Sequence, residues 1–212
     1  MNLQMREYLN LTDIIDCNNP SIREKAEELI KGQTEIIEKA RALFYFVRDE
    51  VEYNIYVDKY LAEHFRASNI LAKREGYCVQ KAALLTALAR AAGIPAGVGF
   101  AKLRNNLLPE KTLKWLGTDI LPFHGYSELY IDRKWVKVTP AVDLRTCEKG
   151  RIVPVEFDGK NDALFNSRNQ DGVLHIEYLK FRGRYPDVPL NTLWDTVPRH
   201  YGRKFLEPSR QD

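Results

Sequence analysis

The chain has 212 residues, of which 44% are hydrophobic and 29% are charged, and its formal net charge is +3. These proportions are ordinary for a folded globular protein, and the small charge does not by itself indicate a nucleic-acid or membrane partner. The length suits a single sizeable domain, with or without an appended subdomain.

The N-terminal residues lack the basic and then apolar pattern of a secretory signal, and no stretch approaches the roughly 18 apolar residues that span a bilayer. The three cysteines, Cys17, Cys78 and Cys147, are odd in number and far apart. We therefore expect free thiols rather than a disulfide framework, and a cytoplasmic protein without a membrane partner. The sequence does not indicate an oligomeric state.

The first part of the chain is predicted to be helical. Ser21 and Glu24 form a capping box at the start of a helix over residues 21–31. Thr34 is the expected N-cap of a second helix, in which the apolar residues keep helical spacing to about Arg48.

Further helices are expected before the middle of the chain. Residues 51–57 are β-branched and aromatic and are predicted to be extended, and helical character returns around 67–73. A strongly indicated helix, rich in alanine and leucine, begins at about Val79 and ends before Gly93 and Pro95.

Strand patterns dominate after this helix, in IPAGVGFAKLR (94–104), FHGYSELYID (123–132) and KWVKVTPAV (134–142). The short turn at 132–134 predicts an antiparallel hairpin. Residues 104–121 form a long connection, and residues 144–212 alternate loops with short strand or helix candidates. Helices followed by strands are typical of the α+β fold class.

Cys78 lies where a loop containing Gly76 gives way to the strongly predicted helix. An ordinary thiol has a pKa near 8.5, whereas a helix N-terminus lowers the pKa because its free N–H groups favour the thiolate. The same N–H groups would stabilise an oxyanion, and Gly76 would let the backbone come close. The alternative is that Cys78 is a small buried hydrophobic residue in an alanine-rich helix.

A thiol nucleophile needs a base, and His124 opens a predicted strand from which a side chain can enter a cleft. His64, His175 and His200 lie in a charged segment, a predicted strand and a basic tail. No CxxC, HExxH or glycine-rich phosphate motif is present, so we expect neither a metal nor a cofactor. Basic and aromatic residues alternate near the C-terminus, as in single-strand binders, but no fold signal supports a nucleic-acid partner.

The stretches GYCVQKAALLTALARAAGIPAGVGF (76–100) and HGYSELYIDRKWVKVTPAVD (124–143) together resemble the transglutaminase-like core of the papain-like cysteine peptidase superfamily. FYFVRDEVEY (44–53) resembles the segment that precedes this core. The resemblance covers about 35–143 of a single domain over 1–212, so that 144–212 would be a C-terminal extension. It implies N-terminal helices and a cysteine-bearing helix packed on an antiparallel sheet.

The resemblance also implies roles for individual residues. Cys78 would attack an amide carbonyl and form a thioester, and His124 would take the thiol proton and return it to the leaving group. The family has an aspartate before the proline that follows the tryptophan-containing strand, but this sequence has Thr139 there. Asp143, four residues on, is the tentative third catalytic residue. An acid or amide elsewhere, or a Cys–His dyad, remains open.

The implied substrate is a peptide or a small amide. Hydrolysis is preferred to transamidation because the chain is small and shows no calcium loop or additional β-domain. The alternative is a non-catalytic transglutaminase-like module that binds peptides or nucleic acid, a class favoured by the missing aspartate.

Overall fold

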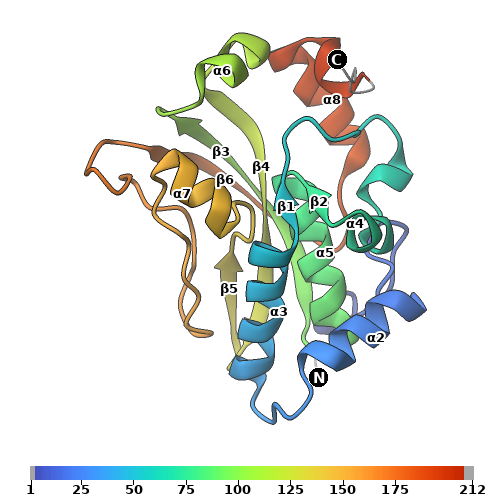
Figure 1. The fold of residues 1–212 in the computed structure, drawn as a ribbon. Coiled ribbons are helices and arrows are strands. Elements are labelled where there is room, and N and C mark those ends of the chain that lie inside the picture. Colours follow the sequence, from blue (N-terminus) through green and yellow to red (C-terminus); the bar gives the residue numbers. More distant parts are fainter. Residues whose placement is uncertain (1–2, 208–212) are drawn as a thin grey trace.

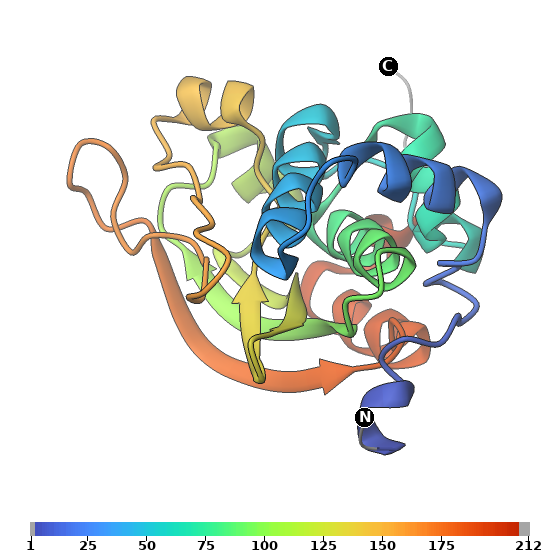
Figure 2. The same ribbon diagram turned by 90° about the horizontal axis from the view of Figure 1, so that it is seen from below.

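A curved four-stranded antiparallel sheet, in the order β5-β4-β3-β6, supports one layer of helices (Figures 1 and 2). The structure is a computed structural model and describes residues 3–207. The strands are β1 (Glu52–Tyr53), β2 (Glu75–Gly76), β3 (Ala96–Asn105), β4 (Ile120–Ile131), β5 (Lys134–Val138) and β6 (Ile176–Tyr185). The helices are α1 (Leu3–Arg6), α2 (Pro20–Leu29), α3 (Ile36–Glu50), α4 (Ala67–Lys73), α5 (Cys78–Ala91), α6 (Glu110–Leu116), α7 (Leu144–Gly150) and α8 (Leu190–Tyr201), with the 3₁₀ helices η1 (Ala62–Phe65) and η2 (Arg203–Leu206).

The α+β class predicted from the sequence is confirmed, but two helix starts differ from the prediction. The N-cap of α2 is Asn19 rather than Ser21. The Asn19 side chain accepts a hydrogen bond from the Ser21 backbone N–H at 3.1 Å. Proline fits the first turn of a helix because its missing N–H has no partner there, so α2 begins at Pro20. The N-cap of α3 is Glu35, not Thr34.

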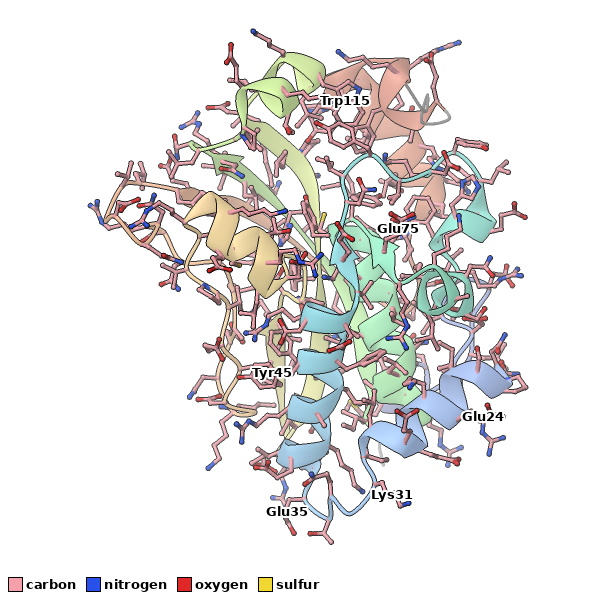
Figure 3. All side chains as sticks on the ribbon, viewed as in Figure 1. Glu24, Lys31, Glu35, Tyr45, Glu75 and Trp115 are labelled. Atoms are coloured by element: carbon pink, nitrogen blue, oxygen red, sulfur yellow. The ribbon has the colours of Figure 1, made fainter. Side chains whose placement is uncertain are left out.

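Helix α5 is the centre of the fold and is buried from Cys78 to Arg90. One side of α5 packs on β4 and β3, while α2, α3 and α4 pack around its other sides. Such complete enclosure explains why alanine and leucine occupy nearly the whole circumference of the helix. Two charged residues of α5, Lys81 and Arg90, are buried with the helix, whereas Glu24 on α2 is exposed (Figure 3).

One short strand pairing lies directly before Cys78 in the chain, and a hairpin follows downstream. The expected extended segment is only the two-residue β1, which pairs in parallel with β2 and places Tyr53 opposite Gly76. Downstream, β4 and β5 form the predicted antiparallel hairpin. Its turn residues, Asp132 and Arg133, have φ values of 48° and 67°, as a tight hairpin turn requires.

The C-terminal part of the chain contributes more structure than its sequence pattern indicates. Strand β6 pairs with β3 and forms one edge of the sheet. Helices α6 and α8 lie together at one end of the molecule, near the top of Figure 1. No helix within residues 3–207 has the length and apolar character needed to cross a membrane.

Strand β4 approaches the N-terminus of α5 so closely that only glycine fits at position 125. A Cβ atom on Gly125 would lie 2.7 Å from the Val79 Cα atom and 3.1 Å from the Val79 backbone nitrogen. Backbone atoms cannot move aside as a flexible side chain can. Because Gly125 directly follows His124, this contact fixes where the histidine meets the helix.

We therefore expect Gly125→Ala to lower the free energy of unfolding by at least about 2 kcal/mol, because the added methyl group overpacks a rigid backbone contact. Gly32→Ala is the control: nothing lies within 4 Å of its added Cβ, so its cost is limited to that of a positive φ, about 1 kcal/mol. Urea denaturation of both variants measures the difference. Equal destabilisation would contradict a close approach at Gly125.

Candidate active site

Cys78 is the first residue of α5, and the first turn of this helix is held from several directions. The Gln80 side chain accepts a hydrogen bond from the Tyr77 backbone N–H at 3.1 Å and donates one to the His64 carbonyl at 2.7 Å. Gln80 also donates to the Asp58 carbonyl at 3.0 Å. A long loop is thereby attached to the helix start, so the Cys78 side chain emerges from a fixed backbone.

Burial outweighs the helix N-terminus in setting the acidity of Cys78. Removal from water raises the pKa of the Cys78 thiol to about 11, although the backbone N–H groups of Gly125, Val79 and Cys78 itself lower it, as does the charge of Lys59. The predicted stabilising N–H groups are therefore present. They do not make a thiolate at neutral pH, because the desolvation cost of the anion is larger.

His124 lies on β4 with only 2% of its surface exposed. Its Nε2 atom is 3.0 Å from the Thr139 Oγ1 atom, and the rings of Phe165 and Tyr178 lie 5.1 Å and 6.2 Å from the imidazole. Burial lowers the His124 pKa to about 3, so the imidazole is neutral at physiological pH. A neutral imidazole has a lone pair on one nitrogen and can act as a base.

Asp143, the expected third catalytic residue, has its carboxylate bound to groups other than His124. It is the N-cap of α7, where it accepts hydrogen bonds from the Thr146 backbone N–H at 2.8 Å and the Thr146 hydroxyl at 3.0 Å. It also accepts one from the Tyr53 backbone N–H at 2.8 Å. Burial alone would raise the Asp143 pKa, but these hydrogen bonds keep it below its usual value. No hydrogen bond joins Asp143 to His124 in the described chain, so its predicted role stays untested.

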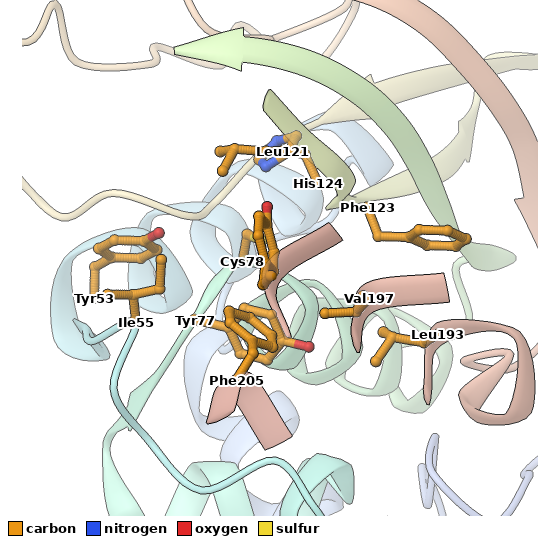
Figure 4. Close-up of a pocket in the computed structure, with 11 residues that line it drawn as sticks. Tyr53, Ile55, Tyr77, Cys78, Leu121, Phe123, His124, Leu193, Val197 and Phe205 are labelled. Carbon is orange, nitrogen blue, oxygen red and sulfur yellow. The ribbon is translucent and has the colours of Figure 1, made fainter. Parts of the chain in front are cut away.

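Two unequal hollows meet at Cys78 and His124. The larger is a cavity of about 310 Å³ that extends toward the connection before α6 and toward α7. The smaller is a hollow of about 30 Å³ bounded by residues of α8 and η2. Figure 4 shows Cys78 and His124 in the smaller hollow, with Tyr53 on one side and Val197 on the other.

The remaining cysteines and histidines lie away from these hollows, with one exception. Cys17 and Cys147 are buried free thiols that approach backbone carbonyls at 3.9 Å and 3.8 Å. His64 accepts a hydrogen bond from a backbone N–H, and His200 is exposed on α8. His175 lines the larger cavity, and burial lowers its pKa. Within residues 3–207 no group of three or more His, Cys, Asp and Glu side chains could hold a metal.

Several residues at the site carry no signal in the sequence. Lys59 is 2% exposed, and its ammonium lies 4.7 Å from the Phe205 ring centroid and 5.6 Å from that of Tyr77. Burial lowers the Lys59 pKa to about 8. Phe165 and Tyr178 cover His124 from the C-terminal part of the chain. They come from segments 41 or more positions downstream of His124, and only the path of the chain brings them together.

Comparisons with known proteins bear on the family and the fold of the chain. A family model described as the transglutaminase-like superfamily matches residues 23–140, more than half of the chain. No curated protein matches the sequence.

Two solved structures resemble this chain to different degrees, and the first of them shares its fold. A candidate cysteine protease from Cytophaga hutchinsonii is 17% identical with a TM-score of 0.52, and the match covers 87% of this chain and 55% of that one. The periplasmic domain of TgpA from Pseudomonas aeruginosa is 23% identical with a TM-score of 0.47, over 66% of this chain and 48% of that one. This chain thus spans about half the length of these relatives, and such low identity indicates the fold alone.

The neutral state of His124 predicts a loss of stability in acid. The unfolded chain binds a proton at this histidine below about pH 6.5, whereas the folded chain does so only near pH 3. The free energy of unfolding should therefore fall as pH drops from 6.5 toward 3, with His124 contributing up to about 1.4 kcal/mol per pH unit.

Urea denaturation between pH 4 and 7 measures this contribution as the difference between the native chain and His124→Gln. The variant should show the shallower slope. His200→Gln, which alters an exposed histidine, is the control and should keep the native slope. Parallel curves for the native chain and His124→Gln would contradict a buried neutral imidazole.

Proposed function

Because this chain belongs to the transglutaminase-like superfamily, we propose that it is a thiol-dependent amide or peptide hydrolase with Cys78 as nucleophile and His124 as base. One observation carries the proposal: Cys78, at the first residue of α5, and His124, on the facing strand β4, line the same two hollows. The fold shared with a candidate cysteine protease supports it.

The two pKa values define the resting state from which the reaction starts. A thiol with a pKa of about 11 and an imidazole with a pKa of about 3 are both neutral at pH 7. Proton transfer must therefore accompany attack on the substrate: the Cys78 sulfur bonds to the carbonyl carbon as His124 takes the thiol proton. The N–H groups near the sulfur then face the developing negative charge on the carbonyl oxygen.

The steps that follow the attack return the proton that His124 has taken. His124 gives its proton to the leaving nitrogen as the C–N bond breaks, which leaves a thioester on Cys78. Water then attacks the thioester, loses a proton to His124 and releases the acid as the C–S bond breaks and the thiol is restored. An amine in place of water would give transamidation.

We assign the positioning of His124 to Thr139 rather than to Asp143. When the Thr139 hydroxyl accepts the Nε2–H of the imidazole, the lone pair is left on Nδ1, the nitrogen available to a proton from Cys78. A hydroxyl cannot stabilise imidazolium as a carboxylate does. Asp143 instead holds the backbone of Tyr53, a residue that lines both hollows.

The alternative function is a non-catalytic module that binds peptides or nucleic acid. The absence of an aspartate at position 139 and the high pKa of the Cys78 thiol favour it. Binding that is unchanged by Cys78→Ala, without turnover of any amide, would distinguish this function from hydrolysis.

The hydrolase proposal predicts selective labelling of Cys78 by iodoacetamide, located by peptide mass mapping. Cys78 should react well before Cys17 and Cys147, because only Cys78 among them lines a described cavity. Its rate should rise with pH through the neutral range without a plateau, since the thiol pKa is about 11. Equal labelling of the three thiols, or a Cys78 rate insensitive to His124→Ala, would count against the proposal.

The positioning role predicts different effects for three substitutions of Thr139. Thr139→Val keeps the shape but loses one hydrogen bond, so kcat/KM for an amide should fall about tenfold, whereas Thr139→Ser should stay near the native value. Thr139→Asp should raise the His124 pKa and speed Cys78 alkylation at pH 7, because a carboxylate stabilises imidazolium. Alkylation unaffected by the aspartate would place Thr139 outside the site.

A further inference from the structure

We propose that the cleft at Cys78 is closed at one end, so that its substrates are amides of compact apolar acids with a leaving group no larger than ammonia or methylamine. This inference rests on the proposed hydrolase function and specifies its substrate class. It depends on the different volumes of the two hollows that meet at Cys78, and on the contacts that hold the side chains lining the smaller one.

The two volumes set the size of each substrate part. A cavity of about 150 Å³ can hold benzene, whereas a water molecule needs only about 10–15 Å³. The 310 Å³ cavity therefore accommodates an acyl group with an aromatic ring and a short chain. The 30 Å³ hollow accommodates about one or two non-hydrogen atoms.

The smaller hollow is closed by the C-terminal elements. Leu193 and Val197 of α8 and Phe205 of η2 line it, and each is at most 4% exposed. In Figure 4 these side chains stand across the hollow from Tyr53 and Ile55. A peptide that extended past Cys78 into the smaller hollow would have to displace these buried apolar side chains.

These C-terminal elements are attached at several points. On α8, Trp194 donates its indole N–H to the Lys59 carbonyl at 3.1 Å, and Tyr201 donates its hydroxyl to the Ile120 carbonyl at 3.3 Å. On η2, the Phe205 ring contacts the Lys59 ammonium at 4.7 Å and the Trp115 ring at 5.4 Å. Trp115 lies beside the C-terminal helices in Figure 3. These contacts hold α8 and η2 in place along the smaller hollow.

Charge indicates which part of the substrate occupies the larger cavity. Leucine, isoleucine and other apolar side chains dominate its lining, and Lys149 is the one lysine, arginine or acidic residue among the described lining residues. A product acid leaves as a carboxylate, which Lys149 attracts. The acyl part therefore belongs in the larger cavity.

The smaller hollow then receives the leaving nitrogen. The released amine exits through the larger cavity, which meets the smaller hollow at Cys78 and His124, and the attacking water enters by the same route. In the first step the C–S bond forms and the C–N bond breaks, and the thiol proton leaves with the amine through His124. Because the nucleophile of the second step attacks from the position that the amine left, a space of water size admits water and excludes large amine acceptors. The site geometry thus favours hydrolysis over protein cross-linking.

Two series of amides test the proposal with the full chain. The first keeps the 3-phenylpropanoyl group and changes the amine from ammonia to methylamine, butylamine and aniline. The second keeps the primary amide and lengthens the acyl group from acetyl to butanoyl and 3-phenylpropanoyl. Acid release is measured by liquid chromatography and mass spectrometry, with Cys78→Ser as the blank.

We expect kcat/KM to fall about 100-fold between the N-methyl and N-butyl amides, because the longer chain overfills a rigid hollow. It should rise with each lengthening of the acyl group. The double variant Leu193→Ala, Val197→Ala enlarges the hollow and should narrow the difference in kcat/KM between the N-butyl and the primary amide. Leu190→Ala, on the same helix but outside the hollow, is the control and should leave that difference unchanged.

Other outcomes overturn the inference. Hydrolysis of the N-butyl and N-phenyl amides as fast as the primary amide would leave the proposed function standing and refute the closed end. Preference for acetyl with a bulky amine would show the opposite orientation. Since the native chain alone distinguishes these results, misfolding of the double variant does not affect the test. Absence of Cys78-dependent turnover in both series would refute this inference, whereas the proposed function is tested separately by the labelling of Cys78 and its dependence on His124.

Discussion

The contact between Gly125 of β4 and Val79 of α5 is the constraint on which the rest of the site depends. A side chain at position 125 would collide with the helix backbone, so glycine sets the minimum separation of strand and helix. Buried hydroxyl groups strengthen the same junction, where Ser127 donates to the Ala82 carbonyl at 2.9 Å and lies 3.3 Å from the Thr86 hydroxyl. The nucleophile and the base thus sit on opposite sides of a rigid junction.

This junction is buried in a low-dielectric environment. Burial sets the protonation states of Cys78, His124 and Lys59. Desolvation disfavours every charged form, so it raises the pKa of the Cys78 thiol and lowers those of His124 and Lys59. The site consequently rests as a neutral thiol and a neutral imidazole. A hydroxyl at position 139 is compatible with this state, since a neutral imidazole needs a hydrogen-bond partner to fix its orientation but no counter-charge.

The C-terminal part of the chain supplies residues that surround the site. Strand β6 and the segment before it place Tyr178 and Phe165 beside His124, and α8 and η2 wall the smaller hollow. Lys59 links these parts because its ammonium contacts the Phe205 ring, while its carbonyl accepts the Trp194 hydrogen bond. The protonation states described above therefore depend on elements outside the residues matched by the family model.

The sequence by itself determined the fold class, the helix that carries Cys78 and the hairpin, because periodicity and turn residues are local properties. The family resemblance selected Cys78 and His124 as candidate catalytic residues, and their roles stay a proposal. Capping patterns in the sequence misplaced the starts of α2 and α3, where Asn19 and Glu35 compete closely with their neighbours as caps. Only the tertiary structure decided which groups surround Cys78 and His124. Burial, which sets their pKa values, and the engagement of Asp143 with Tyr53 both arise from contacts between segments far apart in the chain.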